Sequence, residues 1–210
     1  IVIPTYNRKQ FSDLINHNIN IQTYPLIKEI LIADDGNDDE RLIIESKYSI
    51  LYFKVSRMSI GTKRNFLKEK ADGDYIVHMD TDDMYNKDYI SNSIYNLIKS
   101  GKAITGSSDM LLYLNQKTYN QCCVYADLVN EATMIYKKSY SNTHFFNASS
   151  AGEGVGFVDI GMLFETPIRD IMLCLVHNQN TVNKKIWTTD KYLINFDLTM
   201  YKEHFKKINI

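Results

Sequence analysis

Apolar and polar positions along the first 100 residues form blocks that predict strands followed by helices. Short apolar runs typical of buried strands lie at 1–3, 27–33, 50–55 and 75–79. The segments after these runs predict helices over 11–19, around Leu42–Ile44, over 61–70 and over 90–98. Such alternation implies right-handed crossovers and a mostly parallel sheet with helices on both faces. We therefore expect an α/β fold.

The pattern changes after Gly101. From Ala103 to Tyr136 the chain is rich in Tyr, Thr, Val and Leu without a helical period, which predicts antiparallel or irregular strands. Gly152 to Phe164 predicts a helix with an acidic, glycine-rich start, and the polar stretch from His177 to Trp187 predicts a mobile loop. The second half therefore adds a small mixed region to the parallel core.

Composition narrows the class of protein. The chain has 210 residues, of which 44% are hydrophobic and 23% charged, and this favours one folded domain over a disordered or collagen-like chain. The 24 Lys+Arg nearly balance the 25 Asp+Glu, so no global field attracts nucleic acid, and we expect no nucleic-acid partner. No apolar stretch approaches the roughly 18 residues of a spanning helix, so we expect no membrane span.

Two further features bear on context. Cys122, Cys123 and Cys174 form neither an even disulfide framework nor a CxxC pair, which indicates a reducing compartment and a cytoplasmic or cytosol-facing location. Ile1 already lies inside an apolar run without an initiator Met, so we expect the chain to be part of a longer polypeptide.

Acidic side chains follow two of the predicted strands. Asp34 and Asp35 follow the second strand, and Asp80, Asp82 and Asp83 follow the fourth. The carboxyl ends of parallel strands share one edge of the sheet, where ligands bind. Three carboxylates within four residues repel one another unless a cation or protons compensate, and Mg²⁺ or Mn²⁺ on such oxygens bridges to substrate phosphates. The segment is therefore either a divalent metal site or a solvated acidic turn with helix-capping Asp residues.

Groups suited to a nucleotide lie at the same edge. Thr5, Tyr6 and Arg8 place a hydroxyl, an aromatic face and a guanidinium directly after the first strand. Lys63 and Arg64 lie early in a predicted helix, where cations and backbone N–H groups can face a diphosphate together. The alternatives are a helix N-cap at Thr5, a surface charge at Arg8 and a basic helix face at Lys63 and Arg64.

Four blocks occur in order and at suitable spacing: IVIPTYNR at 1–8, ADDGNDD at 33–39, GTKRN at 61–65 and DYIVHMDTDD at 74–83. Together they resemble the ordered blocks of glycosyltransferase family 2, strongly over residues 1 to about 100 and more weakly beyond. The resemblance implies a GT-A (Rossmann-like) fold, a nucleotide-sugar donor, a Mn²⁺ or Mg²⁺ cofactor and inversion at the anomeric carbon.

The resemblance also implies roles for individual positions. It assigns these residues to the nucleotide-sugar site: Thr5, Tyr6, Arg8, Asp35, Arg64, Asp80 and Asp82. Asp35 would accept a hydrogen bond from the base, typically from uracil N3–H. Asp80 and Asp82 match the Asp-x-Asp element of the family, and Asp82 with Asp83 close behind would bind the metal.

An inverting transfer needs a carboxylate that removes the proton of the acceptor hydroxyl. The family usually places this base in a Gly-Glu-Asp-like block, and Gly152-Glu153-Gly154 occupies that place, so Glu153 is the predicted catalytic residue. Gly154 replaces the second acid, which leaves open whether Glu153 is the base, a positioning residue or a helix-start carboxylate. Later, the segment 176–181 resembles the family's His-containing element, in which His177 would bind the metal or the leaving diphosphate, with a structural role as the alternative.

The sequence thus predicts one GT-A domain over 1–210, with a nucleotide-sugar-binding half over 1–100 and an acceptor-side half over 101–210. The leading hypothesis is a metal-dependent inverting transferase that moves a sugar from a UDP-sugar to a hydroxyl of a glycan, protein or small molecule. A catalytically inactive GT-A module that binds a nucleotide or glycan is the alternative, and Gly154 keeps it open. A nucleotidyltransferase fits the blocks at 1–8 and 33–39 poorly.

Overall fold

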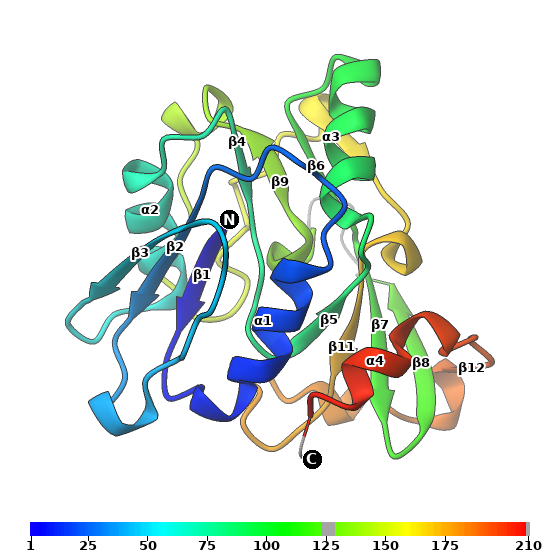
Figure 1. The fold of residues 1–210 in the computed structure, drawn as a ribbon. Coiled ribbons are helices and arrows are strands. Elements are labelled where there is room, and N and C mark those ends of the chain that lie inside the picture. The colour runs from blue at the N-terminus through cyan, green and yellow to red at the C-terminus, as the bar shows by residue number, and fades with distance from the viewer. Residues whose placement is uncertain (123–128, 209–210) are drawn as a thin grey trace.

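The computed structural model describes residues 1–122 and 129–208 and shows an α/β fold (Figure 1). Its first sheet consists of three parallel strands: β1 (Val2–Thr5), β2 (Glu29–Asp34) and β3 (Ser49–Lys54). In this sheet β2 lies between β1 and β3, with Val2 opposite Leu31 and Glu29 opposite Ser49. The three predicted strands are confirmed.

A second sheet continues the first. It has the order β10-β6-β9-β4 and is built from β4 (Tyr75–Val77), β6 (Ile104–Gly106), β9 (Ile135–Lys137) and β10 (Leu163–Glu165). A parallel bridge between Val2 and His78 joins the two sheets, so the chain that leaves β4 runs beside β1. The acids that follow β4 are thereby brought to the edge where β1 ends.

A third sheet supplies the mixed region, and Figure 1 labels its strands. Its order is β12-β8-β7-β11-β5, with β5 (Asp83–Tyr85), β7 (Asp109–Leu114), β8 (Lys117–Cys122), β11 (Met172–Leu175) and β12 (Leu193–Ile194). The hairpin of β7 and β8 turns at Asn115 and Gln116, which both have positive φ, as a two-residue hairpin turn requires. Antiparallel pairing within 103–136 is confirmed.

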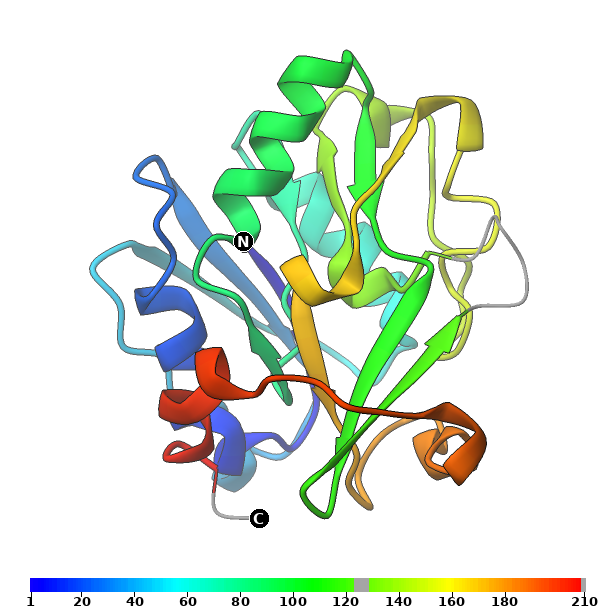
Figure 2. The same ribbon diagram turned by 90° about the vertical axis from the view of Figure 1, so that its right-hand side faces the viewer.

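The α-helices are α1 (Ser12–Asn20), α2 (Ile60–Lys70), α3 (Tyr89–Ser100) and α4 (Lys202–Phe205). The side chain of Ser59 accepts the N–H of Thr62 and so caps the start of α2, and Gly101 ends α3 in the left-handed region. α1 and α2 lie on opposite faces of the parallel sheet (Figures 1 and 2).

Short 3₁₀ helices occupy many of the connections: η1 (Lys9–Phe11), η2 (Asp38–Glu40), η3 (Glu131–Thr133), η4 (Tyr140–Asn142), η5 (Ile160–Met162), η6 (Ile168–Asp170), η7 (Lys184–Trp187), η8 (Asp190–Tyr192) and η9 (Thr199–Tyr201). The loop predicted from His177 to Trp187 accordingly ends in η7.

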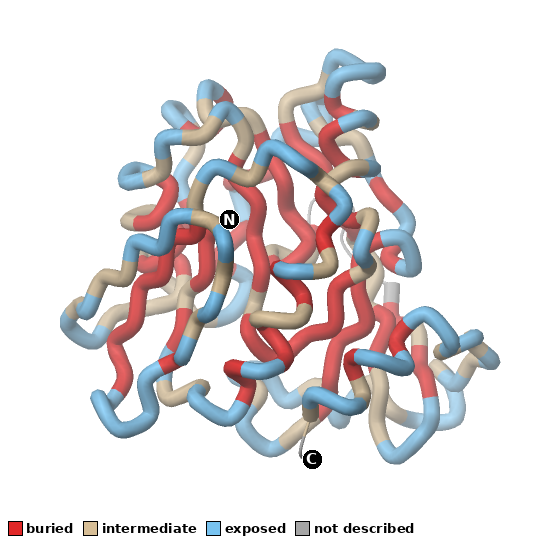
Figure 3. The backbone as a smooth tube through the Cα atoms, viewed as in Figure 1, coloured by how far each residue is buried: buried red, intermediate tan, exposed pale blue. Residues whose placement is uncertain are grey.

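The parallel sheet separates two apolar clusters. Side chains of a strand alternate between its faces, and in β2 Ile30 and Ile32 enter one cluster while Leu31 and Ala33 enter the other. All four side chains are buried, which explains why this strand is a continuous apolar run (Figure 3).

The helix expected around Leu42–Ile44 is not formed. Leu42 is buried, but the segment 41–46 has no regular secondary structure. Its backbone is paired by α1 instead: the N–H of Ile43 donates to Ser12 Oγ at 3.0 Å and the N–H of Glu45 donates to Asn16 Oδ1 at 2.9 Å. Hydrogen bonds from a neighbouring helix replace those that a helix would have made.

The helix expected over 152–164 is also wrong. Gly152 and Gly156 have φ of 63° and 80°, in the left-handed region that interrupts an α-helix, and the chain turns repeatedly before η5 and β10.

None of the helices within 1–122 and 129–208 is long and apolar enough to cross a membrane. Cys174 is buried as a free thiol, whereas Cys123 lies outside the described residues.

Candidate active site

A cavity of about 780 Å³ opens where β1, β3 and β4 end. The cavity is lined by these predicted site residues: Thr5, Tyr6, Arg8, Arg64, Asp80, Asp82, Asp83 and Glu153. Asp35 and His177 do not line it, but each contacts a residue that does. The structure therefore gathers the predicted set around one hollow.

Asp35 is held by donors of this chain. Its side chain, which is 0% exposed, accepts hydrogen bonds from Lys63 Nζ at 2.6 Å and from the N–H of Met58 at 2.9 Å. Burial raises the pKa of Asp35, but these bonds and the charges of Lys63 and Arg57 outweigh it and hold the pKa below its ordinary value. Whether Asp35 also bonds a nucleobase stays a prediction.

Lys63 joins three elements. Its ammonium, at the start of α2, donates to the carbonyl of Thr5 in β1 at 2.8 Å as well as to Asp35 beyond β2. Its side chain is only 3% exposed. Lys63 therefore links the strand ends that frame the cavity, and its charge is neutralised by Asp35.

Sequence reasoning missed Arg57. Its guanidinium lies 3.6 Å from the centroid of the Tyr6 ring and its Nη1 lies 3.2 Å from both carboxylate oxygens of Asp35. Arg57 follows β3 just as Tyr6 follows β1, so the rule that ligands meet the carboxyl ends of parallel strands was the signal that would have found it. The Tyr6 ring and the Arg57 guanidinium are planar groups of the kind that stack on a nucleobase.

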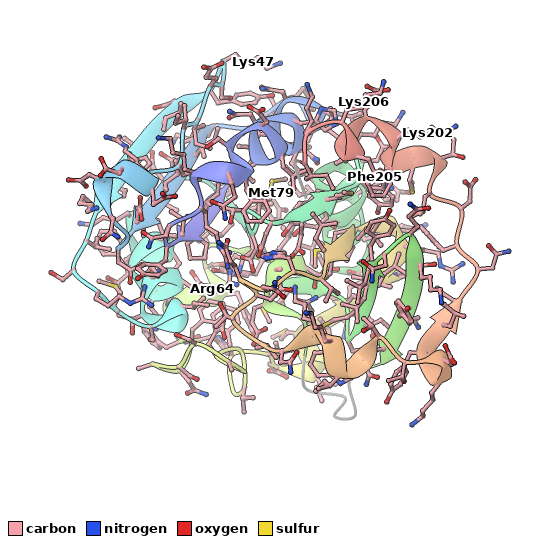
Figure 4. The ribbon with its side chains drawn as sticks, turned by 90° about the horizontal axis from the view of Figure 1, so that it is seen from below. Lys47, Arg64, Met79, Lys202, Phe205 and Lys206 are labelled. Atoms are coloured by element: carbon pink, nitrogen blue, oxygen red, sulfur yellow. The ribbon has the colours of Figure 1, made fainter. Side chains whose placement is uncertain are left out.

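Arg64 bonds two of the acids that line the cavity. Its Nε donates to Glu153 at 3.1 Å and its Nη2 donates to Asp80 at 3.1 Å, while its own side chain is 2% exposed. Figure 4 views the molecule from below Figure 1, the end toward which β1 to β3 run, and labels Arg64. This one buried guanidinium orients both the first acid of the Asp-x-Asp element and the predicted base.

The acids after β4 differ from one another. Burial raises the pKa of Asp82, but the hydrogen bond from His177 and the charges of Arg8 and Lys184 outweigh it, so this pKa lies below its ordinary value. Burial and the charges of Asp82 and Asp80 raise the pKa of Asp83 to about 7, although Lys184 opposes them from 3.7 Å. Negative charge is therefore crowded at Asp83.

His177 is placed against the acids. Its Nδ1 accepts the N–H of Gln179 at 3.2 Å, so its Nε2 carries the proton and donates to Asp82 at 2.9 Å. Gln179 in turn accepts a hydrogen bond from Arg8 through its carbonyl at 2.7 Å. The segment that begins at His177 thus packs onto the residues that follow β1 and β4.

The metal assignment stays a prediction. Within 1–122 and 129–208, no group of three or more His, Cys, Asp or Glu side chains is arranged to hold a metal ion. The donor chemistry nevertheless fits a divalent cation, because Asp82 and Asp83 supply adjacent carboxylates and the charged form of Asp83 is disfavoured by its neighbours' negative charge; His177 could join them only by giving up its Nε2 proton. A cation at this place would relieve that repulsion.

Glu131, in η3, also lines the cavity, and sequence reasoning missed it. Its Oε1 accepts the N–H of Gly154 at 2.8 Å. Burial and the charge of Glu153 raise the pKa of Glu131 against the opposing charge of Arg64. No motif surrounds Glu131, so nothing in the sequence pointed to it.

A parallel sheet with helices on both faces and acids beyond the carboxyl ends of its strands agrees with the GT-A fold that the sequence blocks implied. The chain belongs to glycosyl transferase family 2, whose family model matches residues 1–124. The resemblance found in the sequence blocks is confirmed.

Among curated proteins, the chain is similar to the poly(ribitol-phosphate) β-N-acetylglucosaminyltransferase TarS of Staphylococcus aureus. The two are 28% identical over 100 residues, which are 44% of this chain and 18% of TarS. It is also 22% identical to the glycosyltransferase GlyA of Streptococcus pneumoniae over 221 residues, covering 99% of this chain and 30% of GlyA. The chain thus spans less than a third of the length of these relatives.

Solved structures confirm the GT-A fold. TarS 1–349 of S. aureus in complex with UDP-GlcNAc superposes with a TM-score of 0.62 at 13% identity, over 85% of this chain and 58% of that one. The mannosyltransferase PcManGT of Pyrobaculum calidifontis in complex with GDP-Man and Mn²⁺ gives a TM-score of 0.58 at 13% identity, over 85% of this chain and 57% of that one.

Proposed function

We propose that this chain transfers a sugar, with inversion, from a nucleotide-sugar donor, in particular a UDP-sugar, to a hydroxyl of a glycan, protein or small-molecule acceptor. One observation supports this most. Residues that family resemblance assigned to the nucleotide-sugar site from separate blocks, among them Tyr6, Arg64 and Asp82, line one cavity. Solved relatives of the same fold bind UDP-GlcNAc or GDP-Man.

In this proposal the nucleobase of the donor lies at the ends of β1 and β3. Tyr6 is 41% exposed, and Arg57 lies against its ring, so planar surface is available for stacking. Arg8 and Lys184 are the cations nearest to Asp82 and Asp83, at 3.5 and 3.7 Å. They are therefore the side chains at hand to stabilise the negative charge of a departing diphosphate.

Asp82, Asp83 and His177 are the residues that would hold Mn²⁺ or Mg²⁺. When bound, the ion would neutralise charge that develops on the diphosphate oxygens. Arg64 keeps Asp80 in place beside them, and Asp80 retains a partly exposed side chain that can meet the ribose or the sugar. A solved relative is in complex with Mn²⁺ together with GDP-Man.

Proton transfer needs a carboxylate near the acceptor hydroxyl. Glu153, the predicted base, lines the cavity next to Arg64, and Glu131 lies close enough for the charge of Glu153 to raise its pKa. The cavity therefore offers carboxylates that could accept the proton as well as the cations Arg8 and Lys184.

The test has two stages. Calorimetry measures binding of UDP and of GDP with and without Mn²⁺, and a UDP- or GDP-release assay then screens a panel of nucleotide sugars that includes UDP-GlcNAc. Metal-dependent UDP binding with turnover of a UDP-sugar is expected. Binding with no turnover across the panel would favour the inactive GT-A module instead, and preferential GDP binding would correct the nucleotide.

A further inference from the structure

One carboxylate that lines the cavity, that of Glu131, forms no ion pair within residues 1–122 and 129–208. Five acids line it: Asp80, Asp82, Asp83, Glu131 and Glu153. Four of them are paired, Asp80 and Glu153 with Arg64, Asp82 with Arg8 and Asp83 with Lys184. Among the ion pairs of residues 1–122 and 129–208, Glu131 takes part in none.

This difference matters for proton transfer. A charge-assisted hydrogen bond to a guanidinium occupies a carboxylate oxygen and fixes the orientation of the carboxylate. Glu153 is in that position, because Arg64 Nε donates to its Oε1 at 3.1 Å and both side chains are almost fully buried. Within the part of the chain that the structure describes, Glu131 makes no such bond, and burial and the charge of the neighbouring Glu153 raise its pKa more than Arg64 lowers it.

Gly154 explains how Glu131 reaches this place. A Cβ at 154 would lie 2.9 Å from both Cγ and Oε1 of Glu131 and 3.1 Å from Cε of Met134. The φ of Gly154 is not in the left-handed region, unlike that of Gly152 and Gly156, so its backbone does not itself require glycine. The requirement is space: a side chain at 154 and the present position of Glu131 exclude each other.

We propose that Glu131 is the base of the transfer, and that it takes the space which a side chain at position 154 would otherwise fill. This rests on the proposed function. The acceptor oxygen bonds to the anomeric carbon, the bond from that carbon to the diphosphate oxygen breaks, and its electron pair leaves with the nucleoside diphosphate. The acceptor proton passes to the Glu131 carboxylate, and Glu153 is a positioning residue that holds Arg64.

The first experiment compares single variants with the donor that the wild type turns over best. Glu131→Gln keeps the oxygen that accepts the N–H of Gly154, so its melting temperature and its affinity for UDP should match the wild type. Its kcat should fall by about 10²- to 10⁴-fold, the usual contribution of a general base. Glu153→Gln should reduce kcat less and keep the acidic limb of the pH–rate profile. Glu69→Gln, an exposed carboxylate of α2, is the matched control.

The second experiment asks whether the carboxylate can be moved. Glu131→Ala should be inactive, and adding Gly154→Asp should restore turnover at least tenfold, because the new side chain starts 2.9 Å from the position of the lost oxygen. A purely structural role for Glu131 predicts no such recovery.

The outcomes separate the two proposals. Wild-type protein that turns over no donor in the panel would overturn the proposed function and this assignment with it. A wild type that turns over a donor, together with a Glu131→Gln variant of similar kcat or a double variant without recovery, would overturn the assignment of Glu131 alone.

Discussion

The ion pair between Lys63 and Asp35 predicts a large loss of stability when one partner is removed. The atoms lie 2.6 Å apart, the side chains are 3% and 0% exposed, and Lys63 also donates to the carbonyl of Thr5. Removing one partner of a buried pair costs about 3–5 kcal/mol, because an uncompensated charge stays behind. For Lys63→Met we expect the lower end, about 3 kcal/mol, because Arg57 still faces Asp35 at 3.2 Å.

The assay is urea unfolding at pH 7, followed by circular dichroism, together with thermal melting. A loss of about 3 kcal/mol should lower the melting temperature by roughly 6–12 °C in a domain of this size. Lys206→Met, which removes an exposed pair with Glu203, is the matched control and should leave the midpoint nearly unchanged.

A second variant separates the pair from the loss of the lysine stem. Adding Asp35→Asn to Lys63→Met removes the stranded charge, so the double variant should recover part of the lost stability. A loss below about 1 kcal/mol for Lys63→Met alone, as for an exposed pair, would refute the reasoning.

Three further predictions concern the cavity. Asp82→Asn should abolish Mn²⁺-dependent donor turnover in the nucleotide-release assay while circular dichroism shows that the fold is kept; near wild-type turnover would contradict the metal assignment. The pKa of Asp83 is about 7 in the fold against 3.8 ordinarily. Without metal, this group therefore contributes stability to the protein below about pH 3.8, and the contribution is lost as the pH rises through about 7. Asp83→Asn should accordingly stabilise the protein at pH 8 and not at pH 3.5 in urea unfolding. Arg57→Ala should weaken UDP binding by about 3- to 30-fold in calorimetry, and an unchanged affinity would mean that the uracil ring does not bind against Arg57.

Local patterns determined much of the fold. The apolar runs of β1 to β4 and the patterns of residues in α1, α2 and α3 are properties of short segments, and they predicted those elements. The same approach was wrong around Leu42, where α1 side chains supply the hydrogen bonds, and after Gly152, where two left-handed glycines interrupt the helix. Pairing with distant residues and backbone torsions are not visible in a short apolar pattern.

The candidate site divides in the same way. Residues that directly follow strands, such as Tyr6 and Asp82, were found from the sequence because parallel strands bring their carboxyl ends to one edge. Only the tertiary structure revealed that Lys63 is committed to Asp35 and that Arg64 holds Glu153. It alone placed Glu131 against Gly154, because steric exclusion and burial arise between segments that meet only when the chain is folded.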